Sequence, residues 1–194
     1  ISKKRSKKKG FKLLINLIIS TIPVVIIGFA ISYFKIDIIR TIEVIGWTTL
    51  IFGILLGIVD RNPKALKKLA HIKLKDSILI GFAQTIALIP GVSRSGIVMT
   101  SGLLMGFNRY EASKYSLLLS IPVIIAATSL ESISLYMEKG FFFNNDMMVG
   151  VTVSFITALL TITLFMKWIN KASLKIFVIY RVILGIMILI FSYS

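Results

Sequence analysis

The 194-residue chain is 56% hydrophobic with a mean hydropathy of +0.90, and its formal net charge is +15. Several apolar runs approach the roughly 20 residues that a helix needs to cross a hydrocarbon core of about 30 Å, and they lack the polar face of a soluble helix. This composition excludes a soluble globular domain and predicts an all-α, polytopic membrane protein. Since cysteine is absent, disulfides, a thiol nucleophile and a thiolate metal site are excluded.

Five apolar segments predict transmembrane helices in one integral-membrane domain that covers residues 1–194. They are residues 13–34, 41–59, 112–136, 147–168 and 176–193. The basic stretch that precedes the first segment is interpreted as a loop. In the second segment, Gly53 and Gly57 have the spacing that lets two membrane helices approach closely, although this pattern also arises by chance.

Residues 77–107 form another apolar run, which Pro90-Gly91-Val92-Ser93-Arg94-Ser95-Gly96 interrupts. As helices at 1.5 Å per residue, residues 77–89 would span about 20 Å and residues 97–107 about 16 Å. Each half reaches the bilayer midplane, but neither crosses the bilayer comfortably. Two topologies remain, a single broken crossing or a re-entrant hairpin that returns to its own side.

The loop charges favour the re-entrant hairpin. With a returning hairpin, nearly all Lys and Arg residues of the loops fall on one side, and the opposite side holds only Lys35, Arg40 and Lys139. A single crossing gives a weaker bias. Because basic loops stay in the cytoplasm, both hairpin ends are predicted to lie at the cytoplasmic face. The same residues meet anionic lipid headgroups, so the positive charge does not require a nucleic acid partner.

The interruption has the chemistry of an anion site. Non-helical backbone at membrane depth is tolerated only where protein buries it or where it lines a cavity, and Gly91 can adopt a positive φ there. Ser95 or Gly96 is expected to cap a helix that starts at Ile97, turning its free N–H groups toward the break. Arg94 adds a planar, permanently charged fork that suits phosphate oxygens. The competing interpretation is a tight turn with Arg94 reaching to water.

Three further residues are interpreted as surroundings of this site. Gln84 either hydrogen-bonds within it or joins helices, and Thr100 follows the break by about one helical turn. Arg181 either lines the same cavity or extends from a helix end to water. No residue of this chain is expected to bind a metal.

The residues Phe82-Ala83-Gln84, Ala87 through Gly96 and Gly102 through Gly106 resemble the undecaprenyl-diphosphate phosphatase (bacitracin-resistance) family, whose signature PGxSRSG lies on a membrane hairpin. The similarity continues through Thr21-Ile22-Pro23, Asp60-Arg61, Ser120-Ile121-Pro122 and Tyr180-Arg181, and it covers essentially the whole chain.

The resemblance implies a multi-pass enzyme of the plasma (inner) membrane. Such an enzyme hydrolyses undecaprenyl diphosphate to undecaprenyl phosphate and phosphate, recycles the lipid carrier for the cell wall, and needs a divalent cation, Mg or Ca. Its partners are the polyprenyl diphosphate substrate and membrane lipids, without nucleic acid. Arg94 is then the catalytic arginine, and the phosphate-binding residues are Gly91, Ser93, Arg94, Ser95 and Gly96.

The chain departs from the family pattern in two ways. Val98 stands where the family has threonine, and an acidic pair with a serine- and histidine-bearing hairpin, the family's first motif, is absent from these residues. If the architecture is an inverted repeat, only one half of it is complete, and one hairpin and one span are expected before Ile1. The metal ligands and the nucleophile or base are expected there, so the 194 residues alone should be inactive.

A transporter or lipid flippase is the alternative function, because it could use the same broken helix to bind an anion. The sequence leaves open the preferred prenyl chain length, the face on which the site opens, and whether the protein forms a homodimer.

Overall fold

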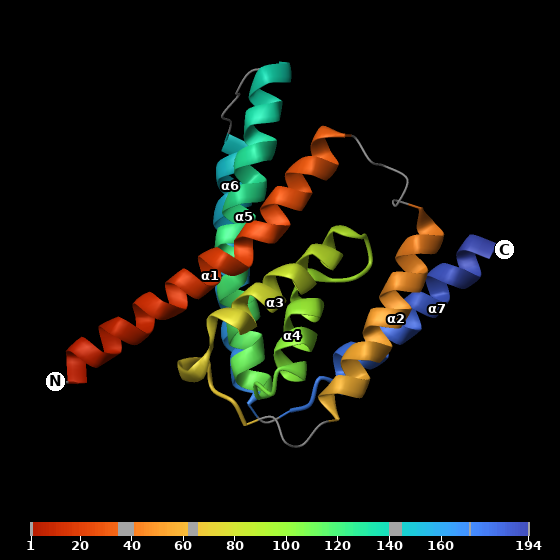
Figure 1. Ribbon diagram of the computed structural model, residues 1–194. Coiled ribbons are helices and arrows are strands. Elements are labelled where there is room, and N and C mark those ends of the chain that lie inside the picture. The colour runs from red at the N-terminus through yellow and green to blue at the C-terminus, as the bar shows by residue number, and fades with distance from the viewer. Residues whose placement is uncertain (1, 35–40, 62–65, 140–144, 171, 194) are drawn as a thin grey trace.

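The computed structural model describes residues 2–34, 41–61, 66–139, 145–170 and 172–193 (Figure 1). These residues form α-helices and two short 3-10 helices. In chain order the elements are α1 (Ser2–Tyr33), α2 (Ile42–Asp60), η1 (Leu69–His71), α3 (Leu74–Thr85), η2 (Ile86–Leu88), α4 (Arg94–Leu104), α5 (Arg109–Lys139), α6 (Asn145–Ile169) and α7 (Lys175–Tyr193). Five of them, α1, α2, α5, α6 and α7, are long and apolar enough to cross a membrane. The predicted all-α polytopic membrane protein is confirmed.

Helix α1 starts earlier than expected. The basic stretch before residue 13 was predicted to be a loop, but the helix runs from Ser2 to Tyr33 without interruption. That prediction is wrong because Lys and Arg are good helix formers, and the first proline, Pro23, lies inside the apolar part. The other long helices start and end within about three residues of the predicted ranges, the usual uncertainty of helix ends.

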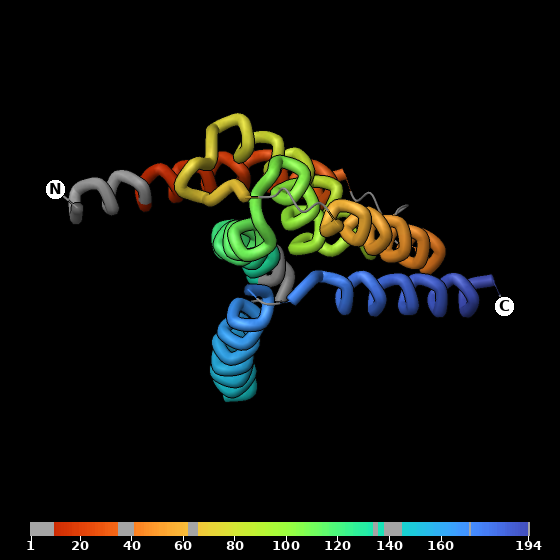
Figure 2. The backbone as a smooth tube through the Cα atoms, turned by 90° about the horizontal axis from the view of Figure 1, so that it is seen from below, coloured from red at the N-terminus to blue at the C-terminus, as the bar shows by residue number. Residues whose placement is uncertain are grey.

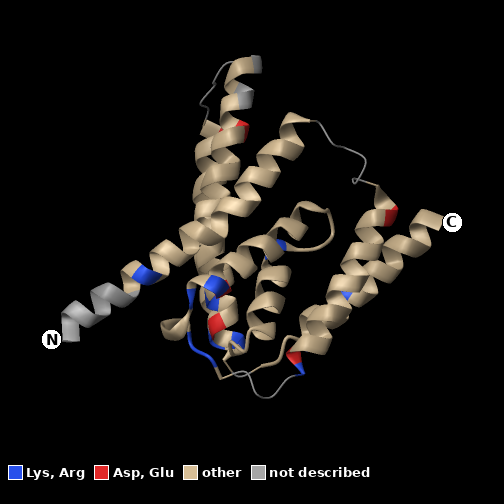
Figure 3. Ribbon diagram, in the orientation of Figure 1, with Lys and Arg blue, Asp and Glu red and all other residues tan. Residues whose placement is uncertain are grey.

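Helices α3 and α4 form a hairpin whose two arms return to the same end. Lys67, before the first arm, donates its N–H to the carbonyl of Gly106 at 2.9 Å and accepts a bond from Asn108 N at 3.3 Å. Figure 1 shows both arms ending beside the start of α5, with the tip pointing toward α2. The two arms thus form a hairpin, whose re-entrant placement in the membrane stays a prediction, and its first arm begins at Leu74 rather than at residue 77. Most described Lys and Arg residues gather at this end (Figure 3).

Helices α2 and α7 form an antiparallel pair in which small residues allow close contact (Figures 1 and 2). A Cβ on Gly53 would lie 2.9 Å from Arg181 Cβ, and one on Gly57 would lie 2.9 Å from Val178 Cγ1. A Cβ on Gly185 would lie 2.9 Å from Leu50 N. The glycine spacing noticed in the sequence is therefore used for helix packing.

Two buried polar clusters tie the helices together. Tyr115 Oη lies 2.7 Å from Ser20 Oγ and donates to Asn16 O at 3.1 Å, while Ser20 Oγ donates to Ser77 O, so that α1, α3 and α5 are linked. At the C-terminal end of α2, Asp60 accepts bonds from Arg109 Nε at 2.5 Å and from Leu174 N at 3.2 Å.

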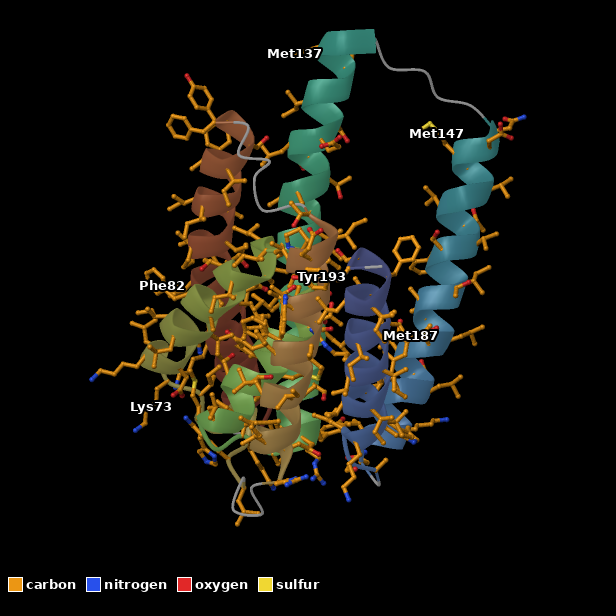
Figure 4. The ribbon with its side chains drawn as sticks, turned by 90° about the vertical axis from the view of Figure 1, so that its right-hand side faces the viewer. Lys73, Phe82, Met137, Met147, Met187 and Tyr193 are labelled. Atoms are coloured by element: carbon orange, nitrogen blue, oxygen red, sulfur yellow. The ribbon has the colours of Figure 1, made fainter. Side chains whose placement is uncertain are left out.

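Helix α6 and the second half of α5 extend away from this assembly. Figure 2 shows α6 reaching out on its own, and Met137 and Met147 mark the far ends of the two helices in Figure 4. Most of their described side chains are exposed, and many of these are large and apolar, including Val153, Phe155 and Leu164. Such surfaces suit a lipid environment.

Candidate functional site

The hairpin tip is docked on α2 through its backbone. Thr48 Oγ1 donates to Pro90 O at 2.6 Å, and Thr49 Oγ1 donates to Gly91 O at 3.2 Å. Gly91 has a φ of +88°, as its predicted role requires, and any Cβ there would overlap Thr48 Oγ1 and lie 2.6 Å from Ile45 O. Only glycine fits between the tip and α2. The sequence reasoning missed both threonines, although they are adjacent polar residues in an otherwise apolar span.

Helix α4 starts at Arg94 rather than at Ile97, and Ser93 is its N-cap. Ser93 Oγ accepts the N–H of Gly96 at 3.3 Å. The prediction that Ser95 or Gly96 caps the helix is wrong, because both residues already lie within the first turn. Ser93 has a φ of +67°, which no other non-glycine residue of the described chain shares. Such strained conformations cost about 1–3 kcal/mol and cluster at functional sites.

Arg181 lies inside the protein and holds the tip. Its guanidinium donates to Gly91 O at 2.7 Å and to Thr49 O at 3.4 Å from both Nε and Nη2. The side chain is 8% exposed, and the absence of a side chain on Gly53 leaves room for it. Of the two alternatives for Arg181, the structure shows the one in which it lines the cavity at the tip.

Arg94 differs from Arg181 in that its side chain has no partner among the described residues. Its side chain is half-buried at the first residue of α4, and its guanidinium makes no hydrogen bond or ion pair within the described chain. The backbone N–H groups of Arg94 and Ser95 are also free of partners among the described residues. The hydroxyls of Ser93 and Ser95 are exposed and lie 3.5 Å apart. Several unused donors therefore meet at one helix N-terminus.

A cavity of about 270 Å³ opens beside this N-terminus. It combines polar groups near α4 with apolar walls from α5, α6 and α7. The lining residues are Leu56, Ser93, Ser95, Gly96, Met99, Ser113, Ser116, Leu117, Thr161, Phe165, Phe177 and Arg181. Ser116 also donates to Ser95 O at 3.3 Å. Of the predicted phosphate-binding residues, Ser93, Ser95 and Gly96 line this cavity, whereas Gly91 faces α2 and Arg94 is not among the lining residues.

Three other residues singled out in the sequence, Gln84, Val98 and Thr100, are not among the residues that line this cavity. Thr100 is buried and donates to Gly96 O at 2.8 Å within its own helix. Gln84 is 1% exposed, and its Nε2 has no hydrogen-bond partner in the described part of the chain. Val98, which replaces the family threonine, is 1% exposed in the hydrophobic core. None of the three makes a hydrogen bond to Ser93, Arg94 or Ser95 in the structure as described.

The described ranges bring together no three His, Cys, Asp or Glu side chains that could hold a metal ion. The residues that surround the hairpin tip therefore offer hydroxyl, guanidinium and backbone N–H donors, which suit an anion rather than a cation.

Comparison with known proteins identifies the family of this chain. The family model described as bacitracin resistance protein BacA matches residues 1–187. The undecaprenyl-diphosphatase of Pelagibacter ubique is 41% identical over 187 residues, which cover 94% of this chain and 72% of the relative. The undecaprenyl-diphosphatase of Alteromonas mediterranea is 43% identical over 183 residues, 94% of this chain and 69% of the relative. The undecaprenyl-diphosphatase of Marinobacter nauticus is 40% identical over 169 residues, 87% of this chain and 64% of the relative. The hairpin with its docked PGVSRSG tip thus lies in a chain that belongs to the bacitracin resistance protein BacA family.

Proposed function

We propose that the protein is an undecaprenyl-diphosphatase of the plasma (inner) membrane, which hydrolyses undecaprenyl diphosphate to undecaprenyl phosphate and phosphate. The names of its relatives support this function. The observation that carries it is the unpartnered guanidinium of Arg94 at the N-terminus of α4. Release of the carrier monophosphate would return it to cell-wall synthesis.

The contrast between the two arginines supports a phosphate ligand. Arg181 donates from Nε and Nη2 to the carbonyls of Thr49 and Gly91, so that only its Nη1 group is left without a hydrogen bond to a described residue. Arg94 keeps five N–H donors without an acceptor, and an arginine at membrane depth is costly unless something satisfies it. A phosphate group would accept from the Arg94 fork and from the free N–H groups at the start of α4, where the helix dipole also favours negative charge.

The cavity supports an amphiphilic substrate. Its polar rim includes Ser93 and Ser95, and its apolar wall includes Leu117, Phe165 and Phe177. We propose that the diphosphate binds at the rim and that the first isoprene units lie along the wall. Arg94 would then stabilise the negative charge that develops on the transferred phosphoryl group.

The requirement for a divalent cation stays a prediction. Because the described residues provide no metal-binding cluster, we assign the cation to none of them and include it in no step of the proposed reaction. Loss of phosphate release on chelation with EDTA, and its return with Mg or Ca, would test the requirement.

Substitution of Arg94 in the full-length protein tests the proposal. Arg94→Ala should reduce phosphate release from undecaprenyl diphosphate by about 10²–10³-fold, the usual effect of removing one transition-state donor. Arg94→Lys should retain part of the activity that Arg94→Ala loses, because lysine keeps the positive charge but lacks the planar guanidinium. Lys68→Ala, in an exposed position, is the charge-matched control.

Release by Arg94→Ala within threefold of wild type would contradict the role of Arg94. Movement of the lipid diphosphate across sealed vesicles without any phosphate release would favour the transporter alternative instead.

A further inference from the structure

A second cavity, of about 450 Å³, lies where α2 ends and α7 begins. Helices α2, α5 and α7 all contribute to it. Its lining residues are Gly57, Asp60, Arg61, Arg109, Lys175, Val178 and Ile179, none of which lines the cavity at the hairpin tip. The proposed phosphate site therefore does not account for this second cavity.

The cavity carries unbalanced positive charge. Its single carboxylate, Asp60, already accepts from Arg109 and from Leu174 N, so that Asp60 and Arg109 neutralise each other. Arg61 and Lys175 are exposed, and neither side chain has a hydrogen bond or ion pair with any described residue. Two cations, one at the C-cap of α2 and one at the start of α7, thus face one cavity, and none of its described lining residues offers them a free carboxylate.

Apolar surface continues from both cations along the helices. On α2, Ile58 and Ile54 follow Arg61 toward the other end of the helix at three- and four-residue spacing, and Ile58 is 62% exposed. On α7, Ile179 and Ile183 follow Lys175 in the same way and are 57% and 54% exposed. A soluble anion would not use these side chains, whereas an acyl chain would cover them.

We propose that this cavity binds the phosphate of an anionic phospholipid headgroup from the cytoplasmic leaflet. Arg61 and Lys175 contact the phosphate, and the acyl chains lie along the exposed isoleucines of α2 and α7. The leaflet follows from the loop charges, which place this end of the protein in the cytoplasm. The bound lipid would hold together the α2–α7 pair that carries Thr48, Thr49 and Arg181, and this site does not depend on the proposed reaction.

Native mass spectrometry of the full-length protein with added phosphatidylglycerol, phosphatidylcholine or inorganic phosphate tests the site. The double variant R61Q/K175Q should bind phosphatidylglycerol about thirtyfold more weakly than wild type, because each basic residue near a lipid surface contributes about a fivefold gain. The control K68Q/K75Q removes the same charge from exposed positions outside the cavity and should bind like wild type. R61K/K175R keeps both charges and should also keep binding.

Three results would overturn the proposal. Equal loss in R61Q/K175Q and K68Q/K75Q would mean a general effect of surface charge. Equal retention of phosphatidylglycerol and phosphatidylcholine by wild type would mean that the headgroup charge is not recognised. Displacement of phosphatidylglycerol by millimolar inorganic phosphate would identify the ligand as a soluble anion.

Discussion

Replacement of Gly91 by alanine tests how the hairpin tip is held. Gly91 has a φ of +88°, a conformation that costs an L-residue with a Cβ about 1–2 kcal/mol. The new Cβ would also overlap Thr48 Oγ1 and lie 2.6 Å from Ile45 O. The tip can relieve this overlap only by moving away from α2. We therefore expect the hydrogen bonds between the tip and its neighbours to weaken.

The structure gives a magnitude for this loss. The two bonds from Thr48 and Thr49 to the tip contribute about 1 kcal/mol each, and the charged bond from Arg181 to Gly91 O about 1.5–3 kcal/mol. With the backbone strain, Gly91→Ala should destabilise the protein by about 4.5–7 kcal/mol if all three bonds are lost. Gly106 is the matched control, because its φ is +84° but a Cβ there meets nothing within 4 Å. Gly106→Ala should cost only the strain, about 1–2 kcal/mol.

Thermal unfolding of the full-length protein in detergent measures the difference. For a chain of this size, about 1 kcal/mol shifts the Tm by about 2–4 °C. We expect Gly91→Ala to lower the Tm by more than about 10 °C and to abolish phosphate release, and Gly106→Ala to lower it by about 2–8 °C with release retained. Equal Tm shifts in the two variants would show that the tip is not packed against α2, and the reasoning would fail.

Three further substitutions test contacts around the site. Asp60→Ala should lower the free energy of unfolding, measured by thermal unfolding, by about 2–3 kcal/mol. Breaking a fully buried ion pair would cost more, but the partner Arg109 is 41% exposed; an unchanged Tm would contradict this. Tyr115→Phe removes the hydroxyl beside Ser20 Oγ and should lower the free energy of unfolding by about 1–2 kcal/mol in the same assay. Assayed at a temperature below its Tm, this variant should release phosphate as fast as wild type. Arg181→Met should reduce phosphate release at least tenfold by releasing the tip, with partial rescue in Arg181→Lys; full activity in the methionine variant would exclude a positioning role.

Helix identity and the hairpin could be predicted from the sequence because both depend on local properties. The length of an apolar run decides whether it can cross a bilayer, and the distribution of Lys and Arg over short loops decides its direction. The start of α1 was missed for a related reason. A run of Lys residues was interpreted as a loop from its charge, although the same side chains favour a helix when nothing interrupts it.

The details of the tip could not be predicted, because distant residues determine them. A proline followed by glycine indicates a turn with a positive φ, and Gly91 has one. The same pattern does not show that Ser93 takes a positive φ and caps α4 in place of Ser95. Nor does it show that Thr48 and Thr49 will meet the tip, since these contacts join residues 42 positions apart.

Arg94 and Arg181 also show why the residue type alone does not determine what a side chain does. From the sequence, Arg94 is interpreted as a phosphate ligand, whereas Arg181 either lines the same cavity or extends from a helix end to water. Arg181 donates from Nε and Nη2 to carbonyl oxygens, which carry no formal charge, so its own charge is not cancelled. Its Nη1 would lie 3.0 Å from a Cβ on Gly96, beside the start of α4. Arg181 therefore adds to the positive potential at the helix N-terminus where Arg94 remains free. An anion there is attracted by both arginines. We therefore propose that Arg181 positions the tip and strengthens its field, and that Arg94 binds the phosphate.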